Sequence, residues 1–230
     1  LDAAPRSIRA VVAGRLDALE RFAAARETGW TPTPAERFEA AETARDAMEW
    51  GRKAYAGWSD GLSESQSRAV TSYTGDAIYK TVNNRLRGER VVYWSEHMDK
   101  VVADLDAALA SRPLAEARTV FRGIEDPDGV LKSLGVKRAE DVKPGMDLLD
   151  PGYTSASASR DRAFDGLQLE IRLPAGAEAA YIESISQAES EAEVLIGREL
   201  DVFRVVAVRG QTIVVEALRS KDVLAGRAER

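Results

Sequence analysis

One stretch organises this sequence: Glu189-Ser190-Glu191-Ala192-Glu193-Val194-Leu195-Ile196 places three carboxylates at alternate positions, and an apolar run follows directly. In an extended strand, residues two apart point to the same side of the sheet. Glu189, Glu191 and Glu193 would then share one face, with like charges about 7 Å apart. The stretch is either a solvated edge strand whose acids keep it unpaired, or a site that uses its acids. Both interpretations stay open from this stretch alone.

The composition limits the chemistry of this chain of 230 residues. With 44% hydrophobic and 30% charged residues it resembles an ordinary globular protein, and no apolar run approaches the roughly 18 residues of a membrane helix. It has no Cys and one His, His97, which we expect at a surface or half-buried position. Disulfides, Cys-His or Ser-His-Asp catalysis, and a His-rich zinc site are therefore not expected. The net charge of -6 argues against general nucleic-acid binding by bulk electrostatics, and a local basic groove stays open.

The N-terminal residues do not have the pattern of a targeting segment. Leu1-Asp2-Ala3-Ala4-Pro5-Arg6 is not followed by the apolar region of a signal peptide. The chain also begins without Met, which fits a processed or excised piece of a longer protein.

Helical periodicity dominates the first half of the chain. Apolar residues at three- and four-residue steps predict helices over residues 6–27 and 34–57, the second with Thr33 as its N-cap. Ser63 and Ser95 are the expected N-caps of two further helices, and the second of these carries an apolar stripe over residues 98–109. Another helix over residues 78–86 is expected to end at Gly88.

Strand patterns dominate the second half. Short strands are predicted over residues 119–123, 167–171, 179–182 and 194–196, and a β-hairpin over residues 202–208 and 212–218. Helices followed by strands, rather than alternating with them, predict an α+β fold. We expect a helical N-terminal extension over residues 1–61, one main domain over residues 62–218 and a charged tail over residues 219–230.

Two other stretches carry polar groups that are suited to act with the acids. Val120-Phe121-Arg122-Gly123 places an arginine in an apolar strand, where it is costly unless it meets an anion; the alternative is an edge arginine facing solvent. Gly152-Tyr153-Thr154-Ser155-Ala156-Ser157 places hydroxyls at alternate positions, where they can bind a neighbouring carboxylate. The alternative for this second stretch is a plain hydroxyl-rich turn.

In this order, Arg122, Ser155-Ala156-Ser157 and Glu191-Ala192-Glu193 resemble the Arg-Ser-Glu class of mono-ADP-ribosyltransferases, with Ala156 where that family usually has Thr. The class includes the clostridial binary toxins, insecticidal toxin domains and phage exoenzymes. The likeness runs from about residue 62 to residue 218. It implies that the helical N-terminal half packs on a mixed, mostly antiparallel two-sheet β core. The resemblance favours a site over a solvated edge strand, and it leaves Glu189 as a surface acid.

The resemblance implies an enzyme that cleaves the bond between nicotinamide and ribose in NAD and transfers ADP-ribose to a host protein. NAD is then a co-substrate, and no metal is required. Glu193 would stabilise positive charge on the ribose, and Ser155 would hold Glu193 in place. Arg122 would bind the NAD phosphates. Glu191 would act on the incoming nucleophile, and in this family a Glu there goes with an arginine acceptor.

Further NAD contacts follow from the same resemblance. The backbone of Gly123 would pair with the nicotinamide amide, and Tyr79 and Asn83 would lie at the adenosine end. The loop before the Glu pair, residues 183–188, lacks an aromatic that some relatives use to touch their target. The remaining candidates are Ser157, the stacking aromatic Phe164 and, in place of an arginine that the family usually has after that aromatic, Arg160 or Arg162.

Two other functions remain open. One is an NAD glycohydrolase, which uses water as the acceptor. The other is a non-enzymatic phage or toxin module that has kept the fold. The sequence names neither the target protein nor the localisation, and secretion, injection or phage delivery into a host cell is the expected route.

Overall fold

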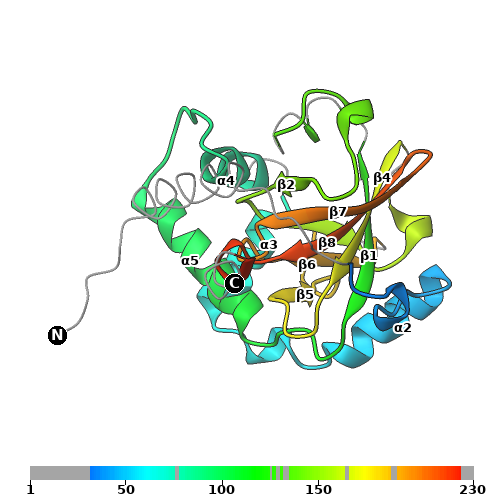
Figure 1. Ribbon diagram of the computed structural model, residues 1–230. Coiled ribbons are helices and arrows are strands. Elements are labelled where there is room, and N and C mark those ends of the chain that lie inside the picture. The colour runs from blue at the N-terminus through cyan, green and yellow to red at the C-terminus, as the bar shows by residue number, and fades with distance from the viewer. Residues whose placement is uncertain are drawn as a thin grey trace.

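A computed structural model describes residues 32–75, 78–124, 126–127, 130–131, 135–163, 166–187 and 191–223. An eight-stranded sheet forms the centre, and most of the helices gather on one side of it (Figure 1). None of the helices in these ranges has both the length and the apolar character needed to cross a membrane. The predicted helix over residues 6–27 lies outside the described residues.

Each predicted strand is present, with ends within about two residues of the predicted ones. The sheet runs β2-β7-β8-β4-β1-β3-β6-β5, and every neighbouring pair is antiparallel except β4 with β8. The hairpin between β7 and β8 is confirmed, with Gly210 at a positive φ of 58° in its turn. The strands are β1 (Arg118–Ile124), β2 (Asp147–Leu149), β3 (Thr154–Ser157), β4 (Leu167–Leu173), β5 (Ala179–Tyr181), β6 (Glu193–Ile196), β7 (Val202–Arg209) and β8 (Thr212–Leu218).

The α+β class is confirmed, but the prediction of a two-sheet core is wrong. Strand β1 pairs with β4 along its whole length and also with β3, through Phe121 and Ser157. This second pairing joins β3, β6 and β5 to the other five strands, so the backbone hydrogen bonds form one continuous sheet.

Side chains cap the helices that begin at Ala44 and Glu64, whereas Ser95, at the N-cap position of the helix that begins at Glu96, makes no side-chain capping hydrogen bond. Ser63 is confirmed as an N-cap, and it forms a capping box in which its hydroxyl accepts from Gln66 N while the Gln66 side chain accepts from Ser63 N. The single helix predicted over residues 34–57 is wrong: a short turn (η1, Ala35–Arg37) is followed by an extended segment, in which Glu39 bridges to Arg118 of β1. The helices are α2 (Ala44–Ala54), α3 (Glu64–Tyr73), α4 (Ile78–Leu86) and α5 (Glu96–Ala110).

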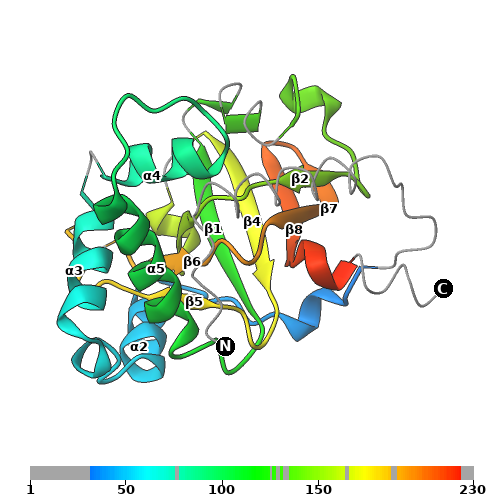
Figure 2. The ribbon, with the colours of Figure 1, turned by 90° about the vertical axis from the view of Figure 1, so that its left-hand side faces the viewer.

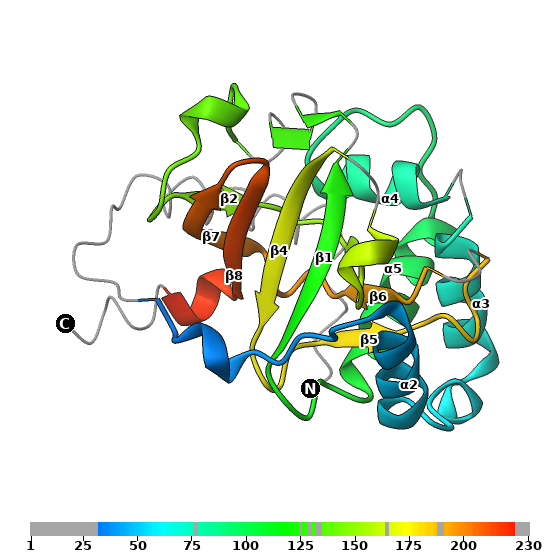
Figure 3. The same cartoon turned by 90° about the vertical axis from the view of Figure 1, so that its right-hand side faces the viewer.

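Helices α3, α4 and α5 lie together on one side of the sheet, and α2 lies beside β5 (Figures 2 and 3). Gly51 of α2 lets the helix approach the ring of Tyr181 so closely that a Cβ atom there would lie 2.4 Å from it. The Tyr55 hydroxyl at the end of α2 donates to the carbonyl of Ala179, at 2.6 Å. The boundary at residue 61 between an extension and the main domain stays a prediction.

Tyr153, directly before β3, connects this strand to two helices. The side-chain amide of Asn83 in α4 donates to the Tyr153 carbonyl and accepts from its N–H, at 3.1 and 2.9 Å. The buried Tyr153 hydroxyl donates to Asp106 of α5, at 2.6 Å. Because Ser155 lies two residues after Tyr153, the contacts of Tyr153 with α4 and α5 also fix the position of the Ser155 hydroxyl.

Candidate active site

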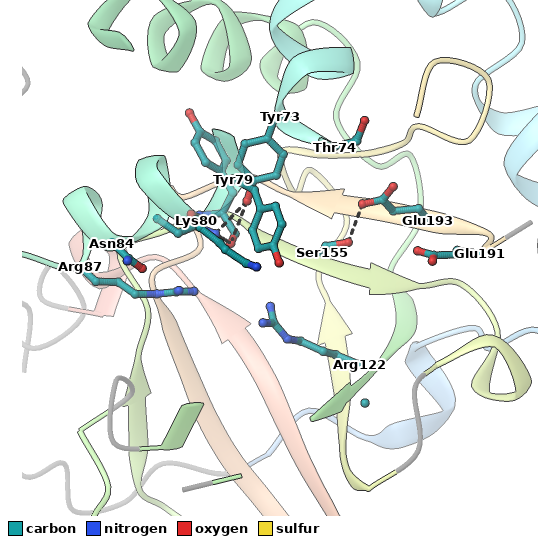
Figure 4. A pocket seen from close by; sticks show the side chains of 13 residues that line it. Tyr73, Thr74, Tyr79, Lys80, Asn84, Arg87, Arg122, Ser155, Glu191 and Glu193 are labelled. Carbon is teal, nitrogen blue, oxygen red and sulfur yellow. Dashed lines mark hydrogen bonds between the residues drawn. The ribbon is translucent and has the colours of Figure 1, made fainter. Parts of the chain in front are cut away.

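A cavity of about 380 Å³ lies between α4, the end of α3 and the strands β1, β3 and β6 (Figure 4). It gathers both carboxylates of the predicted pair, the strand arginine and the first serine of the predicted motif in one place. The lining residues are Tyr73, Thr74, Tyr79, Lys80, Asn83, Asn84, Arg87, Arg122, Gly123, Tyr153, Ser155, Glu191 and Glu193.

Glu193 is the first residue of β6, and its carboxylate is held by two serines. Ser157 lies opposite Glu193 and Ser155 opposite Leu195, so Ser155 is the diagonal neighbour of Glu193 on the same face. Ser155 Oγ donates to Glu193 Oε1 at 2.6 Å, and Ser186 Oγ donates to Oε2 at 2.7 Å. The sequence-based interpretation anticipated the Ser155 contact and missed Ser186. No periodic pattern marks Ser186, because it lies in an irregular loop.

Glu191 lies outside the strand, and the expected alternation on one strand face is wrong at this point. Ala192 between the two acids has a φ of 50°, in the left-handed region that non-glycine residues rarely adopt. Ser157 Oγ donates to the carbonyl of Glu191 at 2.7 Å, and Ala158 N donates to that of Ala192 at 2.9 Å. These bonds hold the turn, which brings Glu191 into the cavity beside Glu193. Glu189 lies outside the described residues.

The two carboxylates differ in environment. Partial burial raises the pKa of Glu191, and the charge of nearby Glu193 adds to this effect. Glu193 itself is only 6% exposed, and its carboxylate accepts two hydroxyl hydrogen bonds. A group whose pKa lies above that of a free carboxyl is suited to accept a proton near neutral pH.

Arg122 extends from β1 into the cavity, between the α4 side chains and the carboxylates (Figure 4). Among the described residues, none forms a hydrogen bond or ion pair with its guanidinium. Burial lowers the pKa of Arg122, whereas the Asp150 carboxylate raises it. An arginine that remains charged and lacks a carboxylate partner is suited to bind an anion. Gly123 lies beside it and also lines the cavity.

Asn83 lines the cavity but is engaged by the protein. Its Nδ2 donates to the Tyr73 hydroxyl, at 2.9 Å, as well as to the Tyr153 carbonyl. Both amide hydrogens are therefore used, and Asn83 acts as a brace for the end of α3 and the start of β3. Tyr79 lies one turn earlier and packs edge-on against Tyr73. The predicted contacts of Tyr79 and Asn83 with NAD stay predictions.

The sequence-based interpretation did not name three polar side chains that line the cavity: Lys80, Asn84 and Arg87. A signal was present, because Tyr79, Asn83 and Arg87 are four residues apart and so share one helix face. Arg87 makes a two-point contact with Asp150, from Nε to Oδ1 at 2.9 Å and from Nη2 to Oδ2 at 2.8 Å. This buried aspartate holds Arg87 in place at the cavity wall.

The loop after β3 carries most of the remaining residues that were predicted to contact NAD. Arg160 Nη2 donates to Glu170 at 2.7 Å and its guanidinium stacks on the Phe121 ring, so this side chain is not among those lining the cavity. Ser157 is engaged with the Glu191 turn. Phe164 and the side chain of Arg162 lie outside the described residues. The roles of these four residues in binding NAD stay predictions.

The arrangement separates charge along the cavity. Arg122, Lys80 and Arg87 provide cationic donors on one side, and Glu191 and Glu193 provide carboxylates on the other (Figure 4). Such a cavity suits an extended ligand with anionic groups at one end and a centre of developing positive charge at the other. Within the described ranges, no cluster of three or more acidic or histidine side chains could hold a metal ion.

Comparison with known proteins gives a consistent result. Residues 47–222 match the family model described as ADP-ribosyltransferase exoenzyme. The chain is 26% identical over 146 residues to "NAD(+)--arginine ADP-ribosyltransferase EFV" of Enterococcus faecalis, covering 62% of this chain and 29% of that protein. It is 28% identical over 171 residues to "Mono-ADP-ribosyltransferase C3" of Hathewaya limosa, covering 66% of each. The chain thus spans less than two thirds of the length of either curated relative.

A solved structure shows the same fold. The chain is similar to Plx2a, an ADP-ribosyltransferase toxin from Paenibacillus larvae, with a TM-score of 0.63 and 27% sequence identity. The similarity covers 76% of this chain and 96% of the toxin chain.

Proposed function

The chain belongs to the ADP-ribosyltransferase exoenzyme family, and from this premise we propose that it is an NAD-dependent mono-ADP-ribosyltransferase acting on a protein arginine. One observation carries the proposal: Glu193, clamped by Ser155, shares a cavity with Arg122, whose guanidinium has no partner among the described residues. Glu191 lies in the same cavity.

The cavity residues fit NAD as the substrate. Arg122 would bind the pyrophosphate, because a planar and permanently charged donor matches phosphate oxygens and has no competing carboxylate partner here. Lys80 would add positive charge nearby, whereas the charge of Arg87 is balanced by Asp150. The tyrosine rings of α3 and α4 would contact the adenosine end, and the backbone of Gly123 would bind the nicotinamide amide.

The reaction breaks the glycosidic bond between ribose and nicotinamide, and the bonding electrons leave with nicotinamide. Positive charge develops on the ribose, as in glycoside cleavage. The Glu193 carboxylate would stabilise this charge, and its two serine partners hold it in position before the reaction begins. An acceptor nitrogen then forms a bond to the ribose carbon and loses a proton. Glu191 would take that proton, for which its raised pKa is suited.

The choice of arginine as acceptor rests on Glu191. A carboxylate can orient a guanidinium through paired hydrogen bonds and accept its proton. The Enterococcus relative, whose name states arginine as the acceptor, supports this choice. The name of the Hathewaya relative states no acceptor residue.

An NAD glycohydrolase is the second candidate, because the same cavity could admit water as the acceptor. The two functions are separated by incubating the protein with labelled NAD, with and without a host lysate. If the protein is a transferase, labelled ADP-ribose should be found on an arginine of a lysate protein, identified by mass spectrometry. Release of nicotinamide with no labelled protein would favour the hydrolase. Label on Asn or Cys instead would overturn the assignment of Glu191.

A further inference from the structure

The Glu193 carboxylate is held from two different parts of the fold. Ser155 of β3 binds Oε1, and Ser186 of the loop between β5 and β6 binds Oε2, at 2.6 and 2.7 Å. A carboxylate with a short hydrogen bond on each oxygen cannot rotate without breaking one of them. Each oxygen still has a lone pair for a further donor.

The loop that carries Ser186 is itself fixed. The N–H groups of Ile185 and Ser186 both donate to the Ile182 carbonyl at 2.9 Å, which closes a tight turn directly after β5. Ile182 N in turn donates to the Glu193 carbonyl at 3.0 Å. The start of the loop is therefore hydrogen-bonded to the backbone of Glu193, and Ser186 binds the side chain of the same residue.

The end of α3 holds the other side of the loop. Thr71 Oγ1 donates to the Ile185 carbonyl at 3.1 Å, and Gln187 Nε2 donates to the Thr71 carbonyl at 2.9 Å. Gln187 N donates to Thr74 Oγ1 at 2.9 Å. Residues 185 and 187 are thus tied to α3 on either side of Ser186, so the position of its hydroxyl is set by the fold.

We propose that Ser186 is a positioning residue for NAD cleavage, which together with Ser155 fixes the Glu193 carboxylate in its working orientation. This inference rests on the proposed function of Glu193. It also gives the loop of residues 183–187 a part in bond cleavage, separate from any contact with the acceptor protein. Hydrolysis and transfer both need Glu193, so loss of the Ser186 hydroxyl should slow both to the same extent.

A matched pair of variants isolates the hydroxyl. The side chains introduced by Ser186→Val and Ser186→Thr have nearly the same shape, but valine has a methyl group where threonine has a hydroxyl. We expect Ser186→Val to lower kcat for NAD hydrolysis about tenfold, the effect of one hydrogen bond to a charged group, with KM for NAD changed less than about twofold. Ser186→Thr should keep most of the activity. Ser184→Ala, at an exposed residue of the same turn, is the control and should match wild type.

A second measurement does not depend on activity. Loss of a hydrogen-bond donor to the ionised carboxylate should raise the pKa of Glu193, followed by ¹³C NMR of the glutamate carboxyls with Glu193→Gln for assignment. The charged side chains that share the cavity, Glu191, Lys80, Arg87 and Arg122, are the same in all the variants. The pKa should rise in Ser186→Val but not in Ser186→Thr.

The outcomes separate this inference from the proposed function. If wild type cleaves NAD but Ser186→Val has the wild-type kcat and the wild-type Glu193 pKa, Ser186 does not position Glu193. If wild type does not cleave NAD, the proposed function fails, and the pKa comparison still decides whether Ser186 controls the carboxylate. Should the valine variant unfold, Ser186→Ala removes the same hydroxyl without adding a branch.

Discussion

Ser155 and Glu193 lie on the neighbouring strands β3 and β6 and are joined by a hydrogen bond of 2.6 Å from Oγ to Oε1. The backbone pairing of the two strands sets this contact, and Asn83 and Asp106 fix the residue that precedes β3. The carboxylate is therefore placed by the sheet and by two helices together. This rigidity suits the role proposed for Glu193, because a displaced carboxylate would lose much of its effect on the charge that develops in the transition state.

The Arg122 guanidinium should dominate NAD binding. We expect Arg122→Lys to weaken binding about tenfold in calorimetry, because lysine keeps the charge but loses the planar two-point contact with phosphate. Arg160→Lys tests the other arginine that was predicted to contact NAD: because Arg160 is paired with Glu170 outside the cavity lining, we expect this change to leave the affinity unchanged. The reverse result, with only Arg160→Lys weakening the binding, would move the phosphate site to the loop after β3.

Glu191 should matter for transfer and not for cleavage. We expect Glu191→Gln to lower transfer to arginine by about 100-fold or more, the usual effect of losing a general base, while NAD hydrolysis stays within a few-fold of wild type. Parallel assays of nicotinamide release and protein labelling measure both. An equal loss of both activities would show that Glu191 acts on NAD itself.

The same variant should be more stable than wild type. The pKa of Glu191 is raised in the folded protein, so the folded state holds its proton more tightly than the unfolded state. Stability is then lost as the pH rises from the ordinary value of 4.5 through the raised pKa, because the ionised form is disfavoured in the fold. Glutamine cannot ionise and removes this loss. Thermal melts should give Glu191→Gln the higher Tm at about pH 7, and the difference should shrink below pH 4.5. A lower Tm at neutral pH would contradict this.

Asn83 should contribute mainly to stability. Asn83→Ala leaves the buried backbone groups of Tyr153 without their partners, at an expected cost of about 2 to 3 kcal/mol in urea unfolding. Asn84→Ala, on the next residue of α4, is a matched control with an expected change within about 0.5 kcal/mol. If the two variants unfold alike while Asn83→Ala loses only NAD affinity, then Asn83 is a ligand contact and not a brace.

The sequence predicted most of the strands, and the residues of its Arg, Ser and Glu motifs lie in one cavity, although their roles in the reaction stay predictions. Arg122, Ser155 and Glu193 lie on regular strands, where spacing and apolar pattern fix which residues come together. Periodicity alone did not bring these strands together: the order of strand arginine, alternating serines and acids before an apolar strand resembles a known family, and that resemblance implied that the three side chains share one site.

The parts that were missed depend on local backbone geometry and long-range pairing. Ala192 adopts a left-handed conformation without being glycine, so alternation suggested a straight strand where the chain turns. The single sheet depends on the pairing of Phe121 with Ser157, which no local pattern reports. Ser186 reaches Glu193 only because α3 holds its loop. Arg87 was detectable, because it continues the helical spacing of Tyr79 and Asn83.

The most direct test of the central claim is release of nicotinamide from NAD by Glu193→Gln, measured beside wild type without any acceptor protein. Glutamine has nearly the same shape as glutamate but cannot place a full negative charge beside the ribose. The account predicts that nicotinamide release and ADP-ribose transfer are both abolished, while NAD still binds and the fold is retained. A Glu193→Gln protein that still releases nicotinamide or labels a target at the wild-type rate would contradict it.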